Sequence, residues 1–299
     1  MANSDATWTL DSIPVHVSHL DKDYWPQAGF TKGDMLRYYR DVAPALLPYL
    51  RDRPVTLRMY PNGVEGASYY QRDRPEHAPE WLRETPYHPK TAQHVTHLPL
   101  VDNSAGLIWL ANAGSVEFHL WGCHLPDLSV PDLAIFDLDP GDTASFADAL
   151  HAALRLREAL DRLSMSGHPK TSGGKGLHVF VPLAGGHSFE DVRAWVKRLS
   201  EQLAADDPAH IAVGGGPTHR GTRVTVDYAQ NAVGRNTATP YTLRTHTPAP
   251  TVSTPLSWDE VAAGGFSPAD FTPVVVLDRI QRMGDLFAPV LTSPQRLSM

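Results

Sequence analysis

Leu133-Ala-Ile-Phe-Asp-Leu-Asp139 is an apolar run of this 299-residue chain that carries two acidic residues near its end. A β-strand turns successive side chains to opposite faces, so we expect Asp137 and Asp139 on one face and the apolar side chains on the other. Pro140-Gly141 then ends the strand and leaves both carboxylates near its C-terminal edge. Adjacent carboxylates repel each other, and their hard oxygen atoms suit Mg²⁺ or Mn²⁺, so the pattern predicts a metal site.

A second acidic strand is expected far downstream, at Arg223-Val-Thr-Val-Asp227. Its two valines can pack inward while Asp227 shares the opposite face with Arg223 and Thr225. An aspartate at a strand end is also typical of a turn, so the strand pattern alone leaves both interpretations open.

A glycine-rich loop lies between these strands, in Lys170-Thr-Ser-Gly-Gly-Lys-Gly-Leu-His-Val-Phe-Val181. Its three glycines allow the backbone to approach an anion closely, and Lys175 adds a positive charge. The loop differs from a Walker A loop because Lys175 is followed by glycine and because the next element is a strand. The pattern predicts a phosphate site of another design, although a solvated hairpin would have similar residues.

Four segments occur in the order seen in the archaeo-eukaryotic primase superfamily: Asp137-Leu-Asp139, Ser172-Gly-Gly-Lys-Gly-Leu-His178, Val226-Asp-Tyr-Ala-Gln-Asn231 and Pro240-Tyr-Thr-Leu-Arg244. Within it, they resemble the polymerase domain of bacterial ligase D and its stand-alone relatives in end joining and gap filling. The likeness runs from about Leu10 to about Leu286. It includes further upstream segments: Asp21-Lys-Asp-Tyr-Trp-Pro26, Thr31-Lys32, Arg53-Pro54, Tyr60-Pro-Asn-Gly63 and Glu117-Phe-His119.

The resemblance implies an α/β (α+β) fold, with a primase-polymerase catalytic core. That core has a mixed β-sheet palm flanked by helices and a second β-rich lobe. We expect residues 10–290 to form a single catalytic domain of two intimately packed lobes. The chain is long enough, and at 42% hydrophobic residues apolar enough, to bury such a core.

Capping residues and apolar periodicity predict three helices: one from Thr31 to about Tyr49, one that Asp142 or Thr143 caps and that runs through Leu163, and one that begins at Ser188. The run from Val55 to Tyr60 predicts a strand. Two looser stretches are expected to be working loops, Arg83–His97 and Ala204–Thr222.

The resemblance also implies which residues carry the chemistry. Asp137, Asp139 and Asp227 would be catalytic and would hold two Mn²⁺ or Mg²⁺ ions. The incoming nucleotide would be bound by five further residues, Ser172, Lys175, His178, Arg244 and His119.

Contacts with DNA are implied for a separate set of residues. Lys22 and Lys32 would hold the 5′-phosphate on the downstream side of a gap. Tyr69 and Tyr70 would stack against a template base, and Arg220 would help to seat the template strand. Without the resemblance, the single lysines would be expected to be solvent-exposed, and the two tyrosines to belong to the core and rim of a sheet.

Composition sets further limits. No run of about 18 apolar residues could span a membrane, and the N-terminus lacks the apolar region of a signal peptide. Cys123 is the one cysteine, so no internal disulfide can form and the cytoplasm is the expected compartment. The formal net charge of −7 argues against an indiscriminate coat on DNA, so a DNA enzyme would concentrate its basic residues on one surface.

Two histidine pairs have the spacing seen in zinc sites: His16 with His19, and His94 with His97. Neither pair has nearby cysteines or a second pair of ligands. We therefore expect solvated histidines at both places.

These features predict a template-directed nucleotidyltransferase that adds nucleotides at DNA ends or gaps, in non-homologous end joining or gap-filling repair. The alternatives are a primase that starts chains without a primer, a D-x-D metal-dependent nuclease or phosphatase, and a catalytically silent scaffold for DNA ends. The expected partners are DNA ends or gapped DNA with a 5′-phosphate, NTP or dNTP, a separate DNA ligase and an end-binding protein. No membrane partner is expected.

Overall fold

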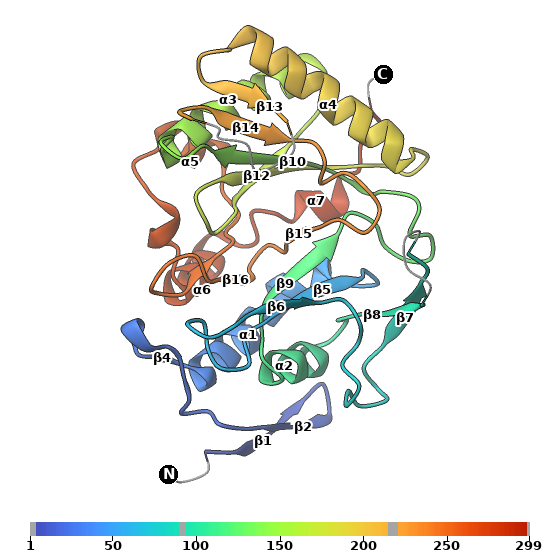
Figure 1. Ribbon diagram of the computed structural model, residues 1–299, viewed down its shortest axis with the longest axis vertical. Coiled ribbons are helices and arrows are strands. Elements are labelled where there is room, and N and C mark those ends of the chain that lie inside the picture. The colour runs from blue at the N-terminus through green and yellow to red at the C-terminus, as the bar shows by residue number, and fades with distance from the viewer. Residues whose placement is uncertain (1–3, 90–93, 215–220, 298–299) are drawn as a thin grey trace.

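The computed structural model describes residues 4–89, 94–214 and 221–297 (Figure 1). In this part of the chain, most strands belong to two sheets of unequal size, and helices pack on both of them. This mixture of helices with antiparallel and parallel strands confirms the predicted α/β (α+β) fold class.

The larger sheet contains both predicted acidic strands. Its strand order is β11 (His168–Thr171), β12 (Leu177–Pro182), β10 (Leu133–Pro140), β14 (Val224–Asp227) and β13 (Ile211–Val213). Neighbouring strands are antiparallel except β13 and β14, which are parallel. The acidic strand β10 therefore lies in the middle of the sheet, with β12 on one side and β14 on the other.

Helices α3 (Phe146–Arg162) and α4 (Phe189–Asp206) pack on the face of this sheet that carries the apolar side chains of β10. Phe136 of β10 meets Trp195 of α4 edge to face, with ring centroids 5.6 Å apart. The start of α4 at Ser188 confirms the prediction. The predicted start of α3 is wrong.

The cap of α3 is Ser145 instead of Asp142 or Thr143. The Ser145 side chain accepts a hydrogen bond from the Asp148 backbone, and the Asp148 carboxylate accepts one from the Ser145 backbone. This reciprocal capping box satisfies two otherwise unpaired backbone N–H groups, which explains why the cap lies three residues before Asp148, so that the helix begins at Phe146.

The smaller sheet has the order β15 (Asn236–Ala238), β9 (Ser115–Trp121), β5 (Val55–Met59) and β6 (Tyr69–Gln71). Helices α1 (Lys32–Leu46) and α2 (Ser104–Asn112) pack together beside it. Thr31 caps α1 and forms a capping box with Asp34, as predicted. The predicted strand at Val55 is β5 and ends one residue early, at Met59.

The two expected loops are partly regular. Arg83–His97 contains β7 (Glu84–Tyr87) and the start of β8 (Thr96–Pro99), which pair as an antiparallel hairpin, and Ala204–Thr222 contains β13. Short strands with proline and histidine give little alternating apolar signal, so sequence periodicity does not reveal them. The buried Thr85 and Leu98 show that tertiary packing stabilises the hairpin.

The remaining elements are short. Besides the hairpin of β7 and β8, three more strand pairs of the described residues lie outside the two sheets: β1 (Ala6–Leu10) with β2 (Ile13–Val17), β3 (Asp23–Trp25) with β4 (Phe30–Thr31), and β16 (Leu243–Arg244) with β17 (Thr251–Val252). The C-terminal part adds α5 (Trp258–Ala263), α6 (Pro273–Met283) and α7 (Pro289–Thr292). Within the described ranges, the helices are all too short or too polar to cross a membrane.

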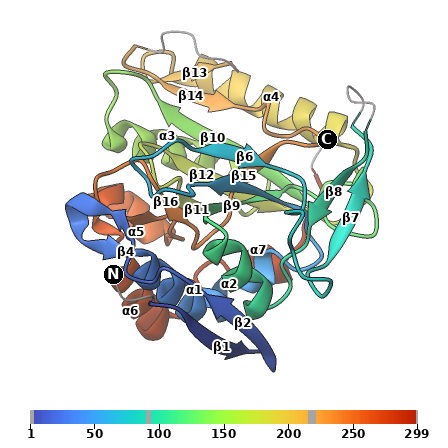
Figure 2. The same ribbon diagram turned by 60° about the horizontal axis from the view of Figure 1, so that its bottom comes forward.

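Both sheets contribute to one continuous hydrophobic core, which joins Leu57 and Phe118 of the smaller sheet to Phe136 and Val179 of the larger. Figure 2 shows the sheets between a layer with α3 and α4 and a layer with α1 and α2. The two sheets therefore lie next to each other, between the helices that cover them. The boundaries of a single two-lobed domain at residues 10 and 290 stay a prediction.

Candidate active site

The three predicted carboxylates lie on two neighbouring strands. Asp137 of β10 is the direct cross-strand partner of Asp227 of β14, and Asp139 pairs with Thr225. Directly opposed side chains project from the same face, with Cβ atoms about 5 Å apart. The sheet therefore brings Asp137, Asp139 and Asp227 together, and their oxygen atoms are a donor set that fits a hard divalent cation.

His178 lies on the other side of Asp137, as its partner on β12. Its Nε2 atom is 3.3 Å from Asp137 Oδ1, and its Nδ1 atom is 2.8 Å from Lys170 Nζ. Burial, followed by the positive charges of Lys170 and Arg244, holds the pKa of His178 well below its usual range. The side chain is therefore a neutral imidazole at the carboxylate centre.

Lys170 is a member of the site that the sequence analysis missed. It is fully buried on β11, and its Nζ atom donates to Ser253 Oγ at 2.6 Å. Burial, with the charge of Arg244, lowers the pKa of Lys170 well below that of an exposed lysine. Its position as the cross-strand partner of His178 was a usable signal, because it puts both side chains on the same face.

The glycine-rich loop is held by its own serine. Ser172 Oγ accepts hydrogen bonds from the backbone N–H groups of Gly174 and Gly176, both at 3.2 Å. Gly173 has a φ of +79°, and a Cβ atom there would lie 2.1 Å from Arg244 Cγ. Only glycine lets the loop pass this close to Arg244, whereas Lys175 is exposed at the tip of the loop.

Arg244 is anchored by a buried carboxylate. Its Nη1 atom is 3.1 Å from Glu117 Oε2, and its Nη2 atom is 2.8 Å from His246 Nε2. Glu117 is completely buried and also contacts His119 Nε2 at 2.9 Å. Burial alone would raise the pKa of Glu117, but Arg244 and then His119 outweigh it and hold that pKa well below its usual value. The carboxylate is thus ionised and fixes both basic side chains.

Four of these side chains line a cleft of about 380 Å³ between the two sheets. Asp137 and His178 line it from the larger sheet, and His119 lines it from the smaller sheet. Arg244 completes the wall from β16. The volume lies in the range of sites that enclose a small ligand.

A family model described as "LigD, primase-polymerase domain" matches residues 31–287 of the chain. The chain belongs to the LigD primase-polymerase family.

Named relatives agree with this assignment. The chain is 32% identical over 278 residues to the "Multifunctional non-homologous end joining protein LigD" of Mycolicibacterium smegmatis, which covers 92% of this chain and 36% of that protein. It is 30% identical over 289 residues to the "Bifunctional non-homologous end joining protein LigD" of Bacillus subtilis, covering 95% of this chain and 46% of the relative. The chain thus spans between a third and a half of the length of these LigD proteins.

A solved structure supports the same family at the level of the fold. The polymerase domain of Mycobacterium tuberculosis ligase D, in complex with DNA, superposes with a TM-score of 0.86 at 29% identity. The match covers 93% of this chain and 98% of that chain. The whole LigD polymerase-domain fold is therefore present here.

The two tyrosines predicted to stack on DNA lie side by side on the strand β6 of this LigD-family domain, and both are more than half exposed. Tyr70 meets the His119 ring edge to face at 5.7 Å, and the Arg58 guanidinium lies 5.4 Å from the Tyr70 centroid. Tyr69 projects to the opposite face of the strand. Of the two tyrosines, Tyr70 therefore lines the cleft and Tyr69 does not.

Lys22 and Lys32 form a separate basic pair. The Lys32 backbone donates to Lys22 O at 2.8 Å, and Lys22 Nζ donates to Pro61 O at 2.7 Å. Lys32 is only 5% exposed, and burial followed by the charge of Lys22 lowers its pKa to about 8. The remaining predicted DNA contact, Arg220, lies outside the described residues.

A second groove, of about 630 Å³, adjoins the cleft and shares Arg72 and Arg235 with it. Arg193 of α4 also lines this groove, as does one acidic residue of the same helix, Glu190. The Arg193 guanidinium lies 5.5 Å from the ring of Tyr228, directly after Asp227. The sequence analysis missed these arginines because they are far apart in the chain and belong to no motif.

Proposed function

We propose that this chain is a template-directed nucleotidyltransferase that extends DNA ends or fills gaps during non-homologous end joining. One observation carries the proposal: Asp137, with Asp139 and Asp227 on the same face of the sheet, shares a cleft with a neutral histidine and an anchored arginine, in a domain of the LigD primase-polymerase family. The carboxylates suit divalent cations, and the arginine suits a polyphosphate.

The proposed roles begin with metal binding by Asp137, Asp139 and Asp227. Two Mn²⁺ or Mg²⁺ ions bound there would lower the pKa of a primer 3′-hydroxyl and stabilise the leaving pyrophosphate. Asp137 is held in place by His178, and the Asp227 carboxylate accepts a hydrogen bond from the Ala229 backbone at 2.7 Å. The ligands are therefore oriented by the protein itself.

The remaining cleft residues would bind the triphosphate. Arg244 offers a planar set of donors, and Lys175 offers a positive charge at the tip of the loop. Ser172 can donate its hydroxyl proton, because its oxygen is the acceptor in both hydrogen bonds with the backbone. His178 and His119 line the same cleft and would flank the nucleotide, with their N–H groups facing Asp137 and Glu117, and Lys170 contacts Nδ1 of His178. Groups fixed before the substrate arrives stabilise a transition state without further reorganisation.

We propose DNA ends and 5′-phosphorylated gaps as the nucleic-acid substrate. Lys22 and Lys32 would hold the 5′-phosphate, while Tyr69 and Tyr70 would offer rings to a template base. A DNA ligase to seal the product, an end-binding protein and a cytoplasmic location follow from this role. The end-joining names of the LigD relatives and the DNA bound to the M. tuberculosis domain support these proposals.

Incubation with a labelled primer-template, Mn²⁺ and either nucleotide class tests the proposed function. We expect template-dependent extension of the primer. Shortening of the primer would instead support a nuclease, synthesis without a primer would support a primase, and a bandshift without any change in length would support a scaffold. Each of these three results, in the absence of extension, would overturn the proposal.

The basic pair gives one prediction. Lys22→Gln/Lys32→Gln is expected to remove the preference for gapped DNA that carries a downstream 5′-phosphate, because two positive charges next to each other attract that group. In the parent protein the preference should decline as the pH rises through about 8, since Lys32 is charged only below its pKa.

Binding titrations with 5′-phosphorylated and 5′-hydroxyl gaps measure this preference within each protein, so the hydroxyl gap is the internal control. If the double variant still discriminates as well as the parent, the two lysines are ordinary surface charges.

The arginine groove gives another prediction. Arg193→Gln and Arg235→Gln should each weaken DNA binding and reduce the slope of log K against log salt by about one, because each arginine replaces one counterion on the backbone. Arg198→Gln is the matched control, since Arg198 is exposed on the same helix as Arg193. Equal salt slopes in all three variants would remove this groove from the DNA path.

A further inference from the structure

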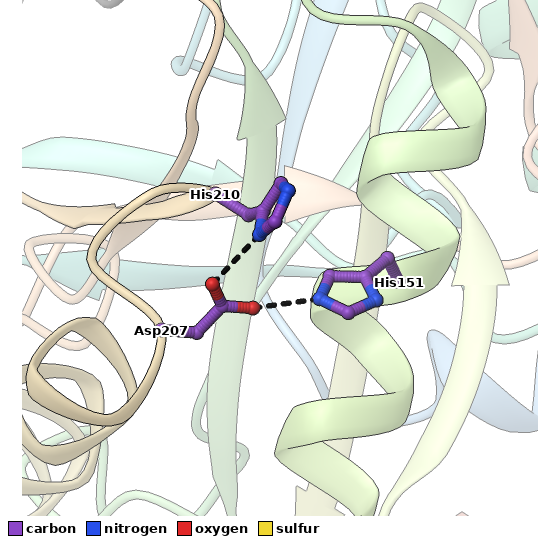
Figure 3. Close-up of side chains that lie close together, drawn as sticks. All are labelled: His151, Asp207 and His210. Carbon is purple, nitrogen blue, oxygen red and sulfur yellow. Dashed lines mark hydrogen bonds and ion pairs between the residues drawn. The ribbon is translucent and has the colours of Figure 1, made fainter.

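A cluster of metal-ligand side chains lies outside the cleft. His151 projects from α3, Asp207 caps the end of α4, and His210 lies directly before β13 (Figure 3). Among the residues that the structure describes, this group alone has three potential ligands whose donor atoms all lie within 4.8 Å of one another. None of the three was predicted from the sequence.

The cluster is already ordered by its own hydrogen bonds. The two Asp207 carboxylate oxygens contact different histidines: His151 Nε2 at 2.6 Å and His210 Nδ1 at 2.7 Å (Figure 3). The imidazole rings are 5.1 Å apart, edge to face. Asp207 is also fixed through the backbone, where its N–H donates to Leu203 O and its carbonyl accepts from Ile211. One nitrogen of each ring thus points at the same carboxylate.

We propose that His151, Asp207 and His210 form a binding site for a transition-metal ion of the zinc type. Nitrogen ligands favour Zn²⁺ over Mg²⁺, which prefers oxygen, so this site would differ in chemistry from the carboxylate centre. In a tetrahedral Zn²⁺ site, donor atoms lie roughly 3.3 Å apart. The two histidine–carboxylate contacts, of 2.6 and 2.7 Å, would widen by small side-chain movements to admit the ion between donor atoms that already lie within 4.8 Å of one another. Water would supply the fourth ligand from the open side, where His151 and His210 are about half exposed.

The charge balance favours a divalent ion. Asp207 supplies an acidic side chain between the two imidazoles, which complements a cation. Asp148 lies one turn before His151 on α3 and adds a second acidic side chain nearby. When the ion binds, each ligating nitrogen would lose its proton, either to solvent or to the other nitrogen of the same ring. Both ligands would then be neutral imidazoles, and the nearby carboxylates would carry the negative charge.

The position suggests a structural ion. His210 leads into β13, which pairs with β14 from Ile211↔Val224 to Val213↔Val226, one residue before Asp227. An ion shared by α3 and the turn between α4 and β13 would cross-link a helix to the edge of the sheet that carries the carboxylates. The expected effect is on stability, with nucleotide addition in Mg²⁺ unchanged.

The test is Zn²⁺ and Co²⁺ binding to the metal-free full chain in excess Mg²⁺, measured by competition with a chromophoric chelator and by the visible absorption of Co²⁺. We expect one ion per chain in the parent protein. His151→Gln and His210→Gln should each weaken binding roughly 10- to 100-fold or more, since even outer ligands of a metal contribute that much. The melting temperature should rise on adding Zn²⁺ to the parent and should not rise for the two histidine variants.

Two controls separate this site from other metal sites. His97→Gln removes an exposed histidine whose ring contacts Glu84 at 2.8 Å, and Asp137→Ala removes a ligand of the carboxylate centre; both should keep the ion. Parent-like binding in a His151→Gln/His210→Gln variant would overturn the proposal. So would loss of all Zn²⁺ binding in Asp137→Ala, or no binding by the parent, since the cluster would then be a histidine–carboxylate clamp only.

Discussion

Asp137→Asn is expected to slow nucleotide addition by about a thousandfold or more, while the affinity for DNA stays near that of the parent. The substitution keeps the shape of the side chain but removes one negative charge from the three carboxylates. Charge stabilisation at a metal centre contributes several kcal/mol to phosphoryl transfer, and each 1.4 kcal/mol corresponds to a tenfold change in rate. Asp139→Asn should behave alike, because Asp139 projects from the same face of β10.

Single-turnover primer extension, alongside DNA bandshifts, measures both quantities. Asp161→Asn is a suitable control, since Asp161 is an exposed carboxylate on α3 and its loss changes the net charge equally. A parent-like rate in the Asp137 variant would contradict the assignment of the carboxylate centre. A loss of DNA affinity equal to the loss of rate would move Asp137 to the DNA path instead.

Arg244→Gln is expected to have two effects, on nucleotide use and on folding. Losing a charge-assisted contact of about 1.5–3 kcal/mol with the triphosphate should raise the nucleotide concentration needed for extension by roughly ten- to over a hundredfold. The same change breaks the closer ion pair of the buried Glu117 and leaves Arg58, 3.8 Å away, as its remaining arginine; breaking a buried ion pair typically costs about 3–5 kcal/mol of stability.

A double variant separates these effects. Arg244→Gln/Glu117→Gln removes both charges, so we expect most of the folding stability to return while nucleotide use stays impaired. Chemical denaturation gives the stability, and nucleotide titrations in single-turnover extension give the binding. If the double variant regains normal nucleotide use, Arg244 only neutralises Glu117 and the triphosphate is held elsewhere.

The sequence allowed the acidic strands to be predicted because their signals are local. Alternation in β10 and β14 identifies the faces that carry Asp137 and Asp227, and the capping boxes at Thr31 and Ser188 mark two helix starts. The family order of motifs then connected distant segments. No local pattern could provide that connection, because which strands are neighbours depends on the tertiary fold.

The residues that escaped prediction are those whose roles depend on packing. Glu117 lies in a matching segment, but its role as the anchor of Arg244 requires two elements 127 positions apart to meet. Arg193 and Arg235 line one groove only because α4 and the chain after β14 are adjacent. The His151, Asp207 and His210 cluster likewise exists only where α3 meets the end of α4.

The chain of contacts behind Asp137 has a direction. The Ser253 hydroxyl gives its proton to Thr171 O, so its oxygen is the acceptor for Lys170 Nζ. Lys170 can then donate its next proton to His178 Nδ1, which leaves the ring hydrogen on Nε2, facing Asp137. The buried hydrogen bonds of Lys170 and Ser253 thereby fix the tautomer of His178. His178 presents a fixed N–H dipole to the carboxylate and need not gain or lose a proton during a catalytic cycle.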